Sequence, residues 1–394
     1  MTALPQTLPP RPWADTPAGV ALLAALDCAA GSSRLVGGAV RDALLGLPVK
    51  DIDLATVFAP EEVMQRLRTH GLKAVPTGLA HGTITAVGDG LAAEITTLRR
   101  DVATFGRHAE VAFTDDWRED ASRRDFTINA LYATLPGGAI SDYFGGRDDL
   151  AAGRVRFIGD PLARIAEDHL RILRFFRFSA RFAGVIDEDG LAACAARAND
   201  LMALSRERIA MEIKGLLETG DPLPTLALML ERGVLSPVLP EITSDRLAVL
   251  ARTIAAETQS GVPAAWQRRL AALLPPACAP EVTARLRLSN ADRARLVLAV
   301  QPMPAGPATT AAYRDGTAVV VDRLLMAGDA EAAAGIAGWQ RPRPPASGKD
   351  IISRGIAPGP DVTARFNRFE RAWVAAGFPV DAAAVAALLD EAAR

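Results

Sequence analysis

The chain of 394 residues has only three cysteines and four histidines. Cys28, Cys194 and Cys278 lie far apart without the spacing of metal ligands, which favours reduced thiols in a cytoplasmic protein. No apolar run approaches the length of a membrane span, so we expect no membrane association. The first 19 residues are rich in proline and lack the apolar centre of a signal peptide, so we expect no secretion signal there.

The sequence also lacks a large excess of one charge. It has 44 basic and 46 acidic residues, a formal net charge of −2. This balance argues against a protein that coats nucleic acid along its whole surface, but it leaves room for a local basic groove. A hydrophobic content of 49% and a charged content of 23% are ordinary for a globular protein, and the length predicts several domains.

The most informative segment reads LVGGAVRDALLGLPVKDIDLAT. Gly37 and Gly38 lack a Cβ and let backbone approach a phosphate closely, and Arg41 can bind phosphate oxygens with two N–H groups. Asp51 and Asp53 are two residues apart, so both would point to the same face of a strand. Two carboxylates on one face repel each other unless a cation lies between them. Their hard oxygen atoms suit Mg²⁺ holding a nucleoside triphosphate.

Each part of this segment has a plainer interpretation, because paired aspartates are common in acidic loops and a glycine pair can form a tight turn. The whole string, however, resembles the signature of the class II tRNA nucleotidyltransferase and poly(A) polymerase family. The resemblance implies an α+β fold: an N-terminal polymerase-beta-like nucleotidyltransferase head of mixed sheet and helices, then an all-α neck, body and tail. It also implies Asp51 and Asp53 as catalytic metal ligands and Mg²⁺ as cofactor.

The order of predicted elements agrees with that division. Between residues 20 and 150, short strands (34–36, 51–55, 83–87 and 92–97) alternate with helices (20–26, 40–45 and 60–70). Later strand signals fade, and helices are predicted over 165–182, 206–217, 224–232, 246–258, 264–274, 280–286, 292–300, 317–327 and from 381 onward. We therefore expect a flexible arm (1–19), a head or palm (20–150), a neck with a base template (151–220), a body (221–300) and a tRNA-binding tail (301–394).

A second segment, RRDFTINAL, resembles another motif of the family. Alone, it is equally compatible with a helix start whose basic residues face solvent. The resemblance implies that Arg124 contacts the triphosphate or ribose of the incoming nucleotide, and that Asp125 and Asn129 shape the ribose pocket. Farther along, DYFGG resembles a third motif, at a domain junction, and we interpret it as structural.

Two features of residues 78–113 remain open. Glu94 is either a third active-site carboxylate, and so a metal ligand, or a structural partner of an arginine. The polar stretch Arg100–Ala112, with Gly106 as a possible hinge, is either a plain surface loop or, by resemblance, the mobile loop linked to adding the final adenosine. The preceding string GLAHGT lacks the basic-aromatic pattern of bacterial poly(A) polymerases and looks like a tRNA nucleotidyltransferase.

A further segment, EDHLRILRFFRF, places Asp168, Arg171 and Arg174 at intervals of three residues, near one face of a predicted helix. An exposed salt bridge on an amphipathic helix is the plainer interpretation. The string resembles the family motif in which an aspartate and an arginine act as a template for the nucleotide base. Asp168 would accept a hydrogen bond from an exocyclic amine and Arg171 would donate to ring acceptors, a pattern that cytosine and adenine match and uracil and guanine do not. Arg174 and Arg177 would then lie near the triphosphate or the RNA end.

The remaining segments are less specific. SRERIAME is interpreted as a capped, structural helix start, and two later strings look similar to alphaproteobacterial members of the family. All four histidines precede residue 170, so we expect no histidine-dependent phosphohydrolase domain such as some relatives carry. Together these features predict an enzyme that adds C, C and A to the 3′ end of tRNA from CTP and ATP. The alternatives are a poly(A) polymerase, a partial CC- or A-adding enzyme, and a non-catalytic RNA-binding protein.

Overall fold

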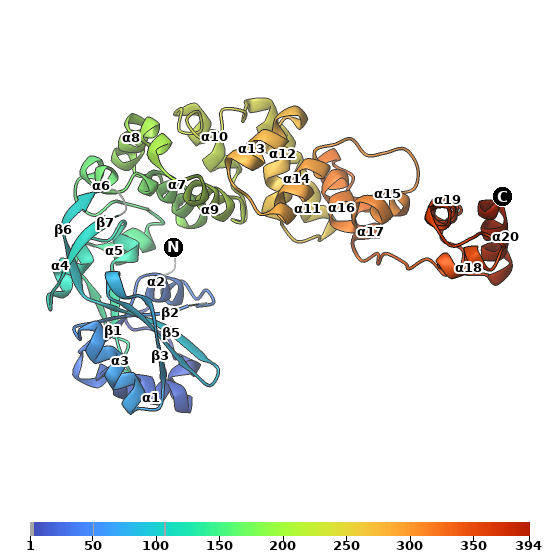
Figure 1. Ribbon diagram of the computed structural model, residues 1–394. Coiled ribbons are helices and arrows are strands. Elements are labelled where there is room, and N and C mark those ends of the chain that lie inside the picture. The colour runs from blue at the N-terminus through green and yellow to red at the C-terminus, as the bar shows by residue number, and fades with distance from the viewer. Residues whose placement is uncertain (1–3, 50, 106–107) are drawn as a thin grey trace. The chain divides into compact units, whose positions relative to one another are not determined.

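The computed structural model describes residues 4–49, 51–105 and 108–394 (Figure 1). The chain forms two compact units. One contains residues 1–219 and 231–238, and the other contains residues 220–230 and 239–394. The first unit thus includes both the expected head and nearly all of the expected neck. No helix in the described part of the chain is long and apolar enough to cross a bilayer.

A seven-stranded mixed sheet forms the centre of the head, as predicted. Its order is β3 (Lys73–Gly78), β4 (Thr83–Gly88), β5 (Leu91–Thr97), β2 (Ile52–Thr56), β1 (Ser33–Val36), β8 (Leu131–Thr134) and β9 (Ile140–Asp142). Only the pairing of β2 with β5 is parallel among these neighbours. Strands β2 and β5 run in the same direction, and register partners on the two strands lie side by side on one face of the sheet.

Helices surround this sheet. They are α1 (Pro17–Ala25), α2 (Gly38–Leu44), α3 (Pro60–Thr69), α4 (Trp117–Ser122) and α5 (Gly146–Ala151). Helices α1 and α3 contact each other, and α3 also packs on β3 and β4 (Figure 1). Part of the expected N-terminal arm makes defined contacts: Thr7 forms a β-bridge with Ala139, and Leu8 is buried. Helix α1 begins at Pro17, three residues earlier than expected, because the Thr16 hydroxyl accepts a hydrogen bond from the Gly19 amide.

The polar stretch at residues 100–112, for which two kinds of loop were considered, belongs to a β-hairpin. Strands β6 (Arg99–Phe105) and β7 (His108–Phe113) form a separate antiparallel two-stranded sheet. Their register pairs Arg99 with Phe113 and Phe105 with His108. Hydrogen bonds between the strands therefore pair backbone N–H and C=O groups that would face water in an irregular loop. The expected hinge at Gly106 lies outside the described residues.

The neck contains the second departure from expectation. The single helix predicted over 165–182 is divided into α6 (Pro161–Glu167) and α7 (Leu170–Phe182). Asp168 interrupts it with φ −151° and ψ 105°, an extended conformation, and its Oδ1 accepts a hydrogen bond from the Leu170 amide at 3.1 Å. An aspartate that bonds to backbone two residues ahead competes with helix continuation and starts the next helix.

Helices α8 (Glu188–Ala196) and α9 (Arg206–Leu217) complete the neck. Helix α7 packs on α9, and a cluster of phenylalanines from α7 joins the helices to the head. Phe157 and Phe175 stack with ring centroids 5.6 Å apart, and Phe126 lies 4.9 Å from Phe157. All three rings are fully buried. This apolar contact fixes α7 relative to the segment that carries Arg124 and Asp125.

The second unit is helical, as predicted. Its helices are α10 (Leu223–Glu231), α11 (Ser244–Ser260), α12 (Trp266–Leu273), α13 (Ala279–Arg285), α14 (Asn290–Ala299), α15 (Ala308–Asp315), α16 (Thr317–Ala327), α17 (Ala330–Ala337), α18 (Gly348–Ile352), α19 (Pro360–Ala375) and α20 (Ala382–Ala393). The sequence analysis did not identify α8, α15, α17, α18 or α19. Buried ion pairs join three of the helices: Arg268 binds Glu257 at 2.7 Å and Asp322 at 2.9 Å.

Candidate active site

A cavity of about 800 Å³ opens in the first unit and brings the predicted site residues together. Every one of them lines it: Gly37, Gly38, Arg41, Asp51, Asp53, Glu94, Arg124, Asp125, Asn129, Asp168, Arg171, Arg174 and Arg177. Their roles remain predictions, but their convergence from segments up to 140 residues apart is a property of the fold. The cavity lining is strongly polar and contains several arginines, which suits a polyanionic ligand.

The glycine pair lies where β1 turns into α2. Gly37 has φ 67° and ψ −127°, a conformation that residues with a Cβ rarely adopt, and its amide donates a hydrogen bond to the Leu131 carbonyl at 3.0 Å. A Cβ at this position would lie 3.5 Å from Nη1 of Arg124. The glycine is therefore required by the backbone turn, which brings the first turn of α2 to the cavity.

The acidic side of the cavity is formed by Asp51, Asp53 and Glu94. Asp53 and Glu94 are register partners on the parallel strands β2 and β5, whereas Asp51 lies one residue before β2. Burial, with added repulsion from Glu94 and then Asp51, raises the pKa of Asp53 to about 6. Glu94 and Asp51 thus oppose the ionisation of Asp53, although Arg124 and Arg41 reduce the effect.

These carboxylates fit a divalent cation. They offer only hard oxygen donors, and a cation would relieve the repulsion that raises the pKa of Asp53. Within residues 4–49, 51–105 and 108–394, no three His, Cys, Asp or Glu side chains are gathered closely enough to hold a metal ion by themselves.

A series of hydrogen bonds connects cavity-lining residues of the head with one of the neck. Nη1 of Arg41 donates to Oδ1 of Asn129 at 2.5 Å, and Nδ2 of Asn129 donates to Oδ1 of Asp125 at 3.0 Å. Oδ2 of Asp125 accepts from Nε and Nη2 of Arg174 at 2.7 and 2.6 Å. Burial alone would raise the pKa of Asp125, but Arg174 and Asn129 outweigh it, and the pKa is lowered. Asp125 is therefore a charged residue that holds Arg174 at the cavity.

Arg124 is held by a second buried group. Its Nη2 donates to Oδ2 of Asp120 at 3.0 Å, and its Nε donates to the Tyr132 hydroxyl at 3.1 Å. The Tyr132 hydroxyl in turn donates to Asp120 at 2.6 Å. Asp120 is fully buried, and Arg124, Arg123 and Tyr132 together overcome the effect of burial and lower the pKa of its carboxyl group. Sequence reasoning did not single out Asp120 or Tyr132, which lie outside the RRDFTINAL segment and hold Arg124 in place.

The neck supplies arginines along α7. Arg174 pairs with Asp125, Arg177 pairs with Glu212 of α9 at 2.5 Å, and Arg181 reaches Asp42 of α2 at 3.1 Å. Phe178, which sequence reasoning also missed as a cavity residue, lies among them, with Cζ of Arg177 4.4 Å from its ring centroid. Burial opposes the charge of Arg174, but its acidic neighbours outweigh burial and raise its pKa. These cations are thus fixed by acidic partners on both sides of the cavity.

Asp168 and Arg171 both line the cavity, but their partners differ. Asp168 stands in the break between α6 and α7, so the expected single helix face does not include it. Its Oδ2 accepts from Nη2 of Arg208 at 2.7 Å. Arg171 donates to Oε2 of Glu167 and to the backbone oxygens of Arg164 and Arg123. In the described part of the chain no ion pair joins Asp168 to Arg171, which excludes the simple salt bridge between them.

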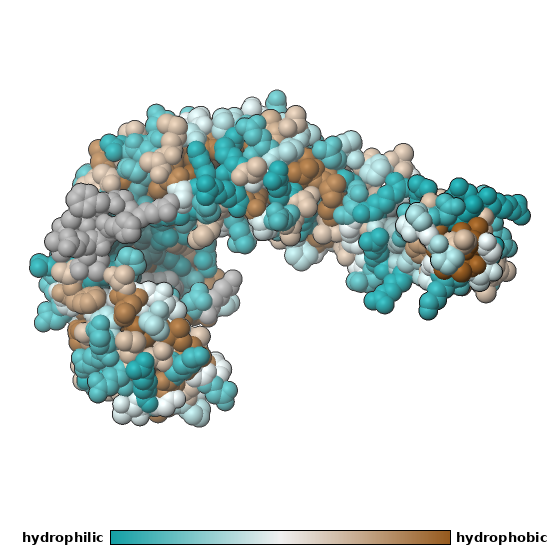
Figure 2. Space-filling model, viewed as in Figure 1, coloured by the Kyte–Doolittle hydropathy of each residue, from teal (hydrophilic) through white to brown (hydrophobic). Residues whose placement is uncertain are grey.

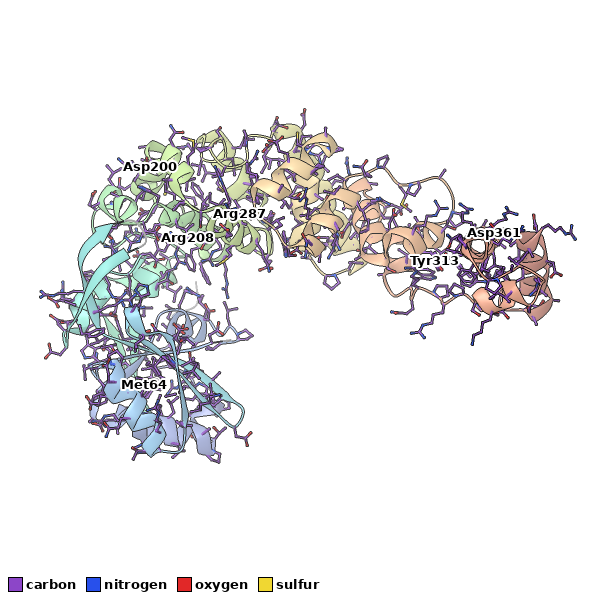
Figure 3. The ribbon with its side chains drawn as sticks, in the orientation of Figure 1. Met64, Asp200, Arg208, Arg287, Tyr313 and Asp361 are labelled. Atoms are coloured by element: carbon purple, nitrogen blue, oxygen red, sulfur yellow. The ribbon has the colours of Figure 1, made fainter. Side chains whose placement is uncertain are left out.

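Arg208 belongs to the SRERIAME segment, which we interpreted as structural only. The expected serine cap is absent, because Ser205 accepts no side-chain hydrogen bond at the start of α9. Arg208 instead reaches Asp168 across 40 residues of sequence. Figure 3 labels Arg208 in this part of the molecule. Nothing in the sequence around Arg208, the third residue of an amphipathic helix, indicates its contact with Asp168.

Comparisons with known proteins identify the family. A model described as the poly A polymerase head domain matches residues 33–156, and one described as the probable RNA and SrmB-binding site of polymerase A matches residues 185–246. A protein named CCA-adding enzyme from Lacticaseibacillus paracasei is 31% identical over 382 residues, covering 93% of this chain and 94% of its own length. The CCA tRNA nucleotidyltransferase 1, mitochondrial, of Danio rerio is 45% identical over 205 residues.

The Danio rerio match covers 51% of this chain and 47% of that protein, so the chain spans about half the length of this relative. Among solved structures, the CCA-adding enzyme of Bacillus stearothermophilus in complex with CTP superposes with a TM-score of 0.74 and 26% identity. The superposition covers 95% of this chain and 98% of that one. The full-length likeness to the Lacticaseibacillus paracasei protein, together with the head match, shows that the chain belongs to the class II tRNA nucleotidyltransferase and poly(A) polymerase family.

Proposed function

We propose that this protein adds C, C and A to the 3′ end of tRNA from CTP and ATP, with no nucleic-acid template. One observation supports the proposal above all: a single cavity joins the carboxylates of the head to the arginines and the Asp168–Arg171 pair of the neck. Nucleotidyl transfer needs a triphosphate-binding surface, acidic ligands near the reacting phosphate and a means of choosing the base. The relatives named as CCA-adding enzymes favour tRNA as the acceptor.

Each side of the cavity has a proposed role. Asp51 and Asp53, with Glu94 beside them, would hold Mg²⁺, which would supply charge neutralisation at the triphosphate and at the attacking 3′-hydroxyl. Arg41, Arg174 and Arg177 would bind phosphate oxygens. Arg124, Asp125 and Asn129 would place the ribose, Arg124 directly and Asp125 by fixing Asn129 and Arg174. Enzymes of this family generally depend on a divalent metal, and Mg²⁺ in particular is our proposal.

The base would be selected by Asp168 and Arg171. A carboxylate oxygen of Asp168 accepts from the exocyclic amine of cytosine or adenine, and the remaining N–H groups of Arg171 donate to the neighbouring acceptors. Uracil and guanine would place a carbonyl against the carboxylate, which leaves both acceptors without a proton. We further propose the division into head, neck, body and tail at the boundaries given above, with the tail binding tRNA, and a cytoplasmic location.

A transfer assay with three acceptors tests the function. The acceptors are tRNA ending before CCA, the same tRNA ending in CC, and an unrelated oligoadenylate, each given one nucleotide at a time. The proposal predicts C addition to the first, A addition to the second and no extension of the third. Extension of oligoadenylate with ATP would indicate a poly(A) polymerase. Only C or only A addition would indicate a partial enzyme, and tRNA binding with no transfer would indicate a non-catalytic protein.

A further inference from the structure

Asp168 is fixed by contacts at both of its carboxylate oxygens. Oδ1 accepts the Leu170 amide at 3.1 Å, and Oδ2 accepts Nη2 of Arg208 at 2.7 Å. Both side chains of the ion pair are partly exposed, at 28% and 30% for Asp168 and Arg208. Water reaches both side chains and screens their attraction, so the contact contributes only modestly to stability.

The two side chains of the pair lie differently with respect to the cavity. Asp168 lines it, whereas Arg208, which is among the described residues, does not. Arg208 therefore approaches the carboxylate from α9, outside the space that a nucleotide would fill. It can orient Asp168 without competing for the same space as the base.

Without Arg208, other cations are available to Asp168. Arg171 follows it by one helical turn, and Arg174 is close enough for Asp168 to be among the residues that raise its pKa. If the carboxylate rotated toward either guanidinium, the acceptor for an exocyclic amine would be occupied. Arg171 instead donates hydrogen bonds to Glu167 and to backbone oxygens, and Asp168 instead accepts one from Arg208. These contacts prevent Asp168 and Arg171 from pairing with each other.

We propose that Arg208 is a positioning residue for base selection, which holds the carboxylate of Asp168 in place at the cavity as a hydrogen-bond acceptor and prevents it from pairing with Arg171 or Arg174. This inference rests on the proposed function, because it assigns Arg208 to the base-reading step of the same site. It makes Arg208 a determinant of which nucleotide is used, although it touches neither the base nor the phosphates.

The inference predicts a defined order among substitutions. Arg208→Met removes both the charge and the donor, so discrimination should fall most. Arg208→Lys keeps the charge but carries it on a compact ammonium group in place of the planar guanidinium, so it should restore part of the discrimination. Lys214→Met is the matched control, since Lys214 lies on the same helix and its ion pair with Glu218 is about half exposed.

The experiment measures kcat/KM for CTP and UTP on tRNA ending before CCA, and for ATP and GTP on tRNA ending in CC. We expect the CTP:UTP and ATP:GTP ratios to fall roughly tenfold in Arg208→Met, to be intermediate in Arg208→Lys and to be unchanged in Lys214→Met. The KM for tRNA and the melting temperature should change little. An equal loss with all four nucleotides, or unchanged ratios in an active Arg208→Met enzyme, would overturn the inference. A wild-type protein that shows no preference for CTP and ATP would instead contradict the proposed function.

Discussion

Asp53 and Glu94 are register partners on the parallel strands β2 and β5, and their carboxylates face the same cavity. Burial and repulsion raise the pKa of Asp53 to about 6 from 3.8. A cation bound between the two carboxylates would relieve this repulsion. This relationship links the topology of the head to its proposed metal chemistry, because register partners on neighbouring strands lie side by side on one face of the sheet.

The raised pKa predicts how the metal-free protein responds to pH. The folded state keeps a proton on Asp53 between about pH 4 and 6, where the unfolded state has lost it, so this group lowers the free energy of unfolding as pH rises through that window. Asp53→Asn removes the effect. In EDTA, the melting temperature of Asp53→Asn relative to wild type should therefore be higher at pH 8 than at pH 4.5. If the melting temperatures of Asp53→Asn and wild type differed by the same amount at both pH values, Asp53 would not have a raised pKa in the folded protein.

Removing either carboxylate should also abolish transfer. Asp51→Ala or Asp53→Ala should lower kcat by at least about a thousandfold. The two carboxylates are proposed to position the cation that stabilises the triphosphate in the transition state. The fold and tRNA affinity should remain. Asp89→Ala is the control, since Asp89 is exposed in the turn between β4 and β5. Near-normal rates with Mg²⁺ in either active-site variant would refute the metal assignment.

The β6–β7 hairpin should matter more for A addition than for C addition. We predict that replacing residues 100–112 by a short turn lowers the rate of ATP incorporation on tRNA ending in CC at least tenfold more than CTP incorporation on tRNA ending before CCA. The reason for this expectation is the resemblance of residues 100–112 to the mobile loop linked to adding the final adenosine. The hairpin forms a sheet of its own, so it can be shortened without removing a strand from the seven-stranded sheet. Equal losses in the two reactions would show that the hairpin is merely structural.

Binding of tRNA should weaken with salt although the net charge is −2. Phosphate contacts release counterions, so the affinity should fall at least about tenfold between 50 and 200 mM salt. The candidates in the neck are Arg171, Arg174, Arg177 and Arg181, and those in the tail are Arg341, Arg343, Lys349 and Arg354. Figure 2 shows many hydrophilic residues on the surface of the C-terminal helices. An affinity independent of salt would exclude a basic track.

The tail can be tested without truncation. Deleting the residues after 300 would divide a buried cluster in which Ala256 packs with Val320 and Leu325, so the second unit would lose its core. Substituting the exposed Arg343 and Lys349 by glutamine avoids this damage. The double variant should raise the KM for tRNA several-fold and leave the KM for CTP unchanged, whereas Lys73→Gln in the head should change neither. A rise in the KM for CTP alone would place the tRNA-binding surface elsewhere.

Local patterns were sufficient for much of the site. The spacing of Asp51 and Asp53 predicted two carboxylates on one face of a strand. The strand is present as β2 and contains Asp53, whereas Asp51 lies one residue before it. Arg171, Arg174 and Arg177 follow the periodicity of α7, which sequence predicts well because it is a long amphipathic helix. The mixed sheet and the helical remainder were likewise predicted and are confirmed.

Other features depend on partners far along the chain. Nothing near Asp168 indicates that it interrupts a helix, because the apolar periodicity continues across it, and its partner Arg208 is 40 residues away. The resemblance predicted that Asp125 shapes the ribose pocket, but not that its oxygens accept hydrogen bonds from Asn129 and from Arg174, which is 49 residues away. The hairpin was missed because its polar sequence resembles a loop and its strands pair only with each other.

The most direct test of the account is the nucleotide preference of Asp168→Ala. If Asp168 reads the base edge, losing its acceptor should lower discrimination against UTP and GTP by about 1–3 kcal/mol, roughly tenfold to a hundredfold in relative kcat/KM. Arg171→Ala should relax selection similarly. The measurement is kcat/KM for all four nucleotides on one tRNA substrate. The account predicts a large fall in the CTP:UTP ratio, and an unchanged ratio in an active Asp168→Ala enzyme would contradict it.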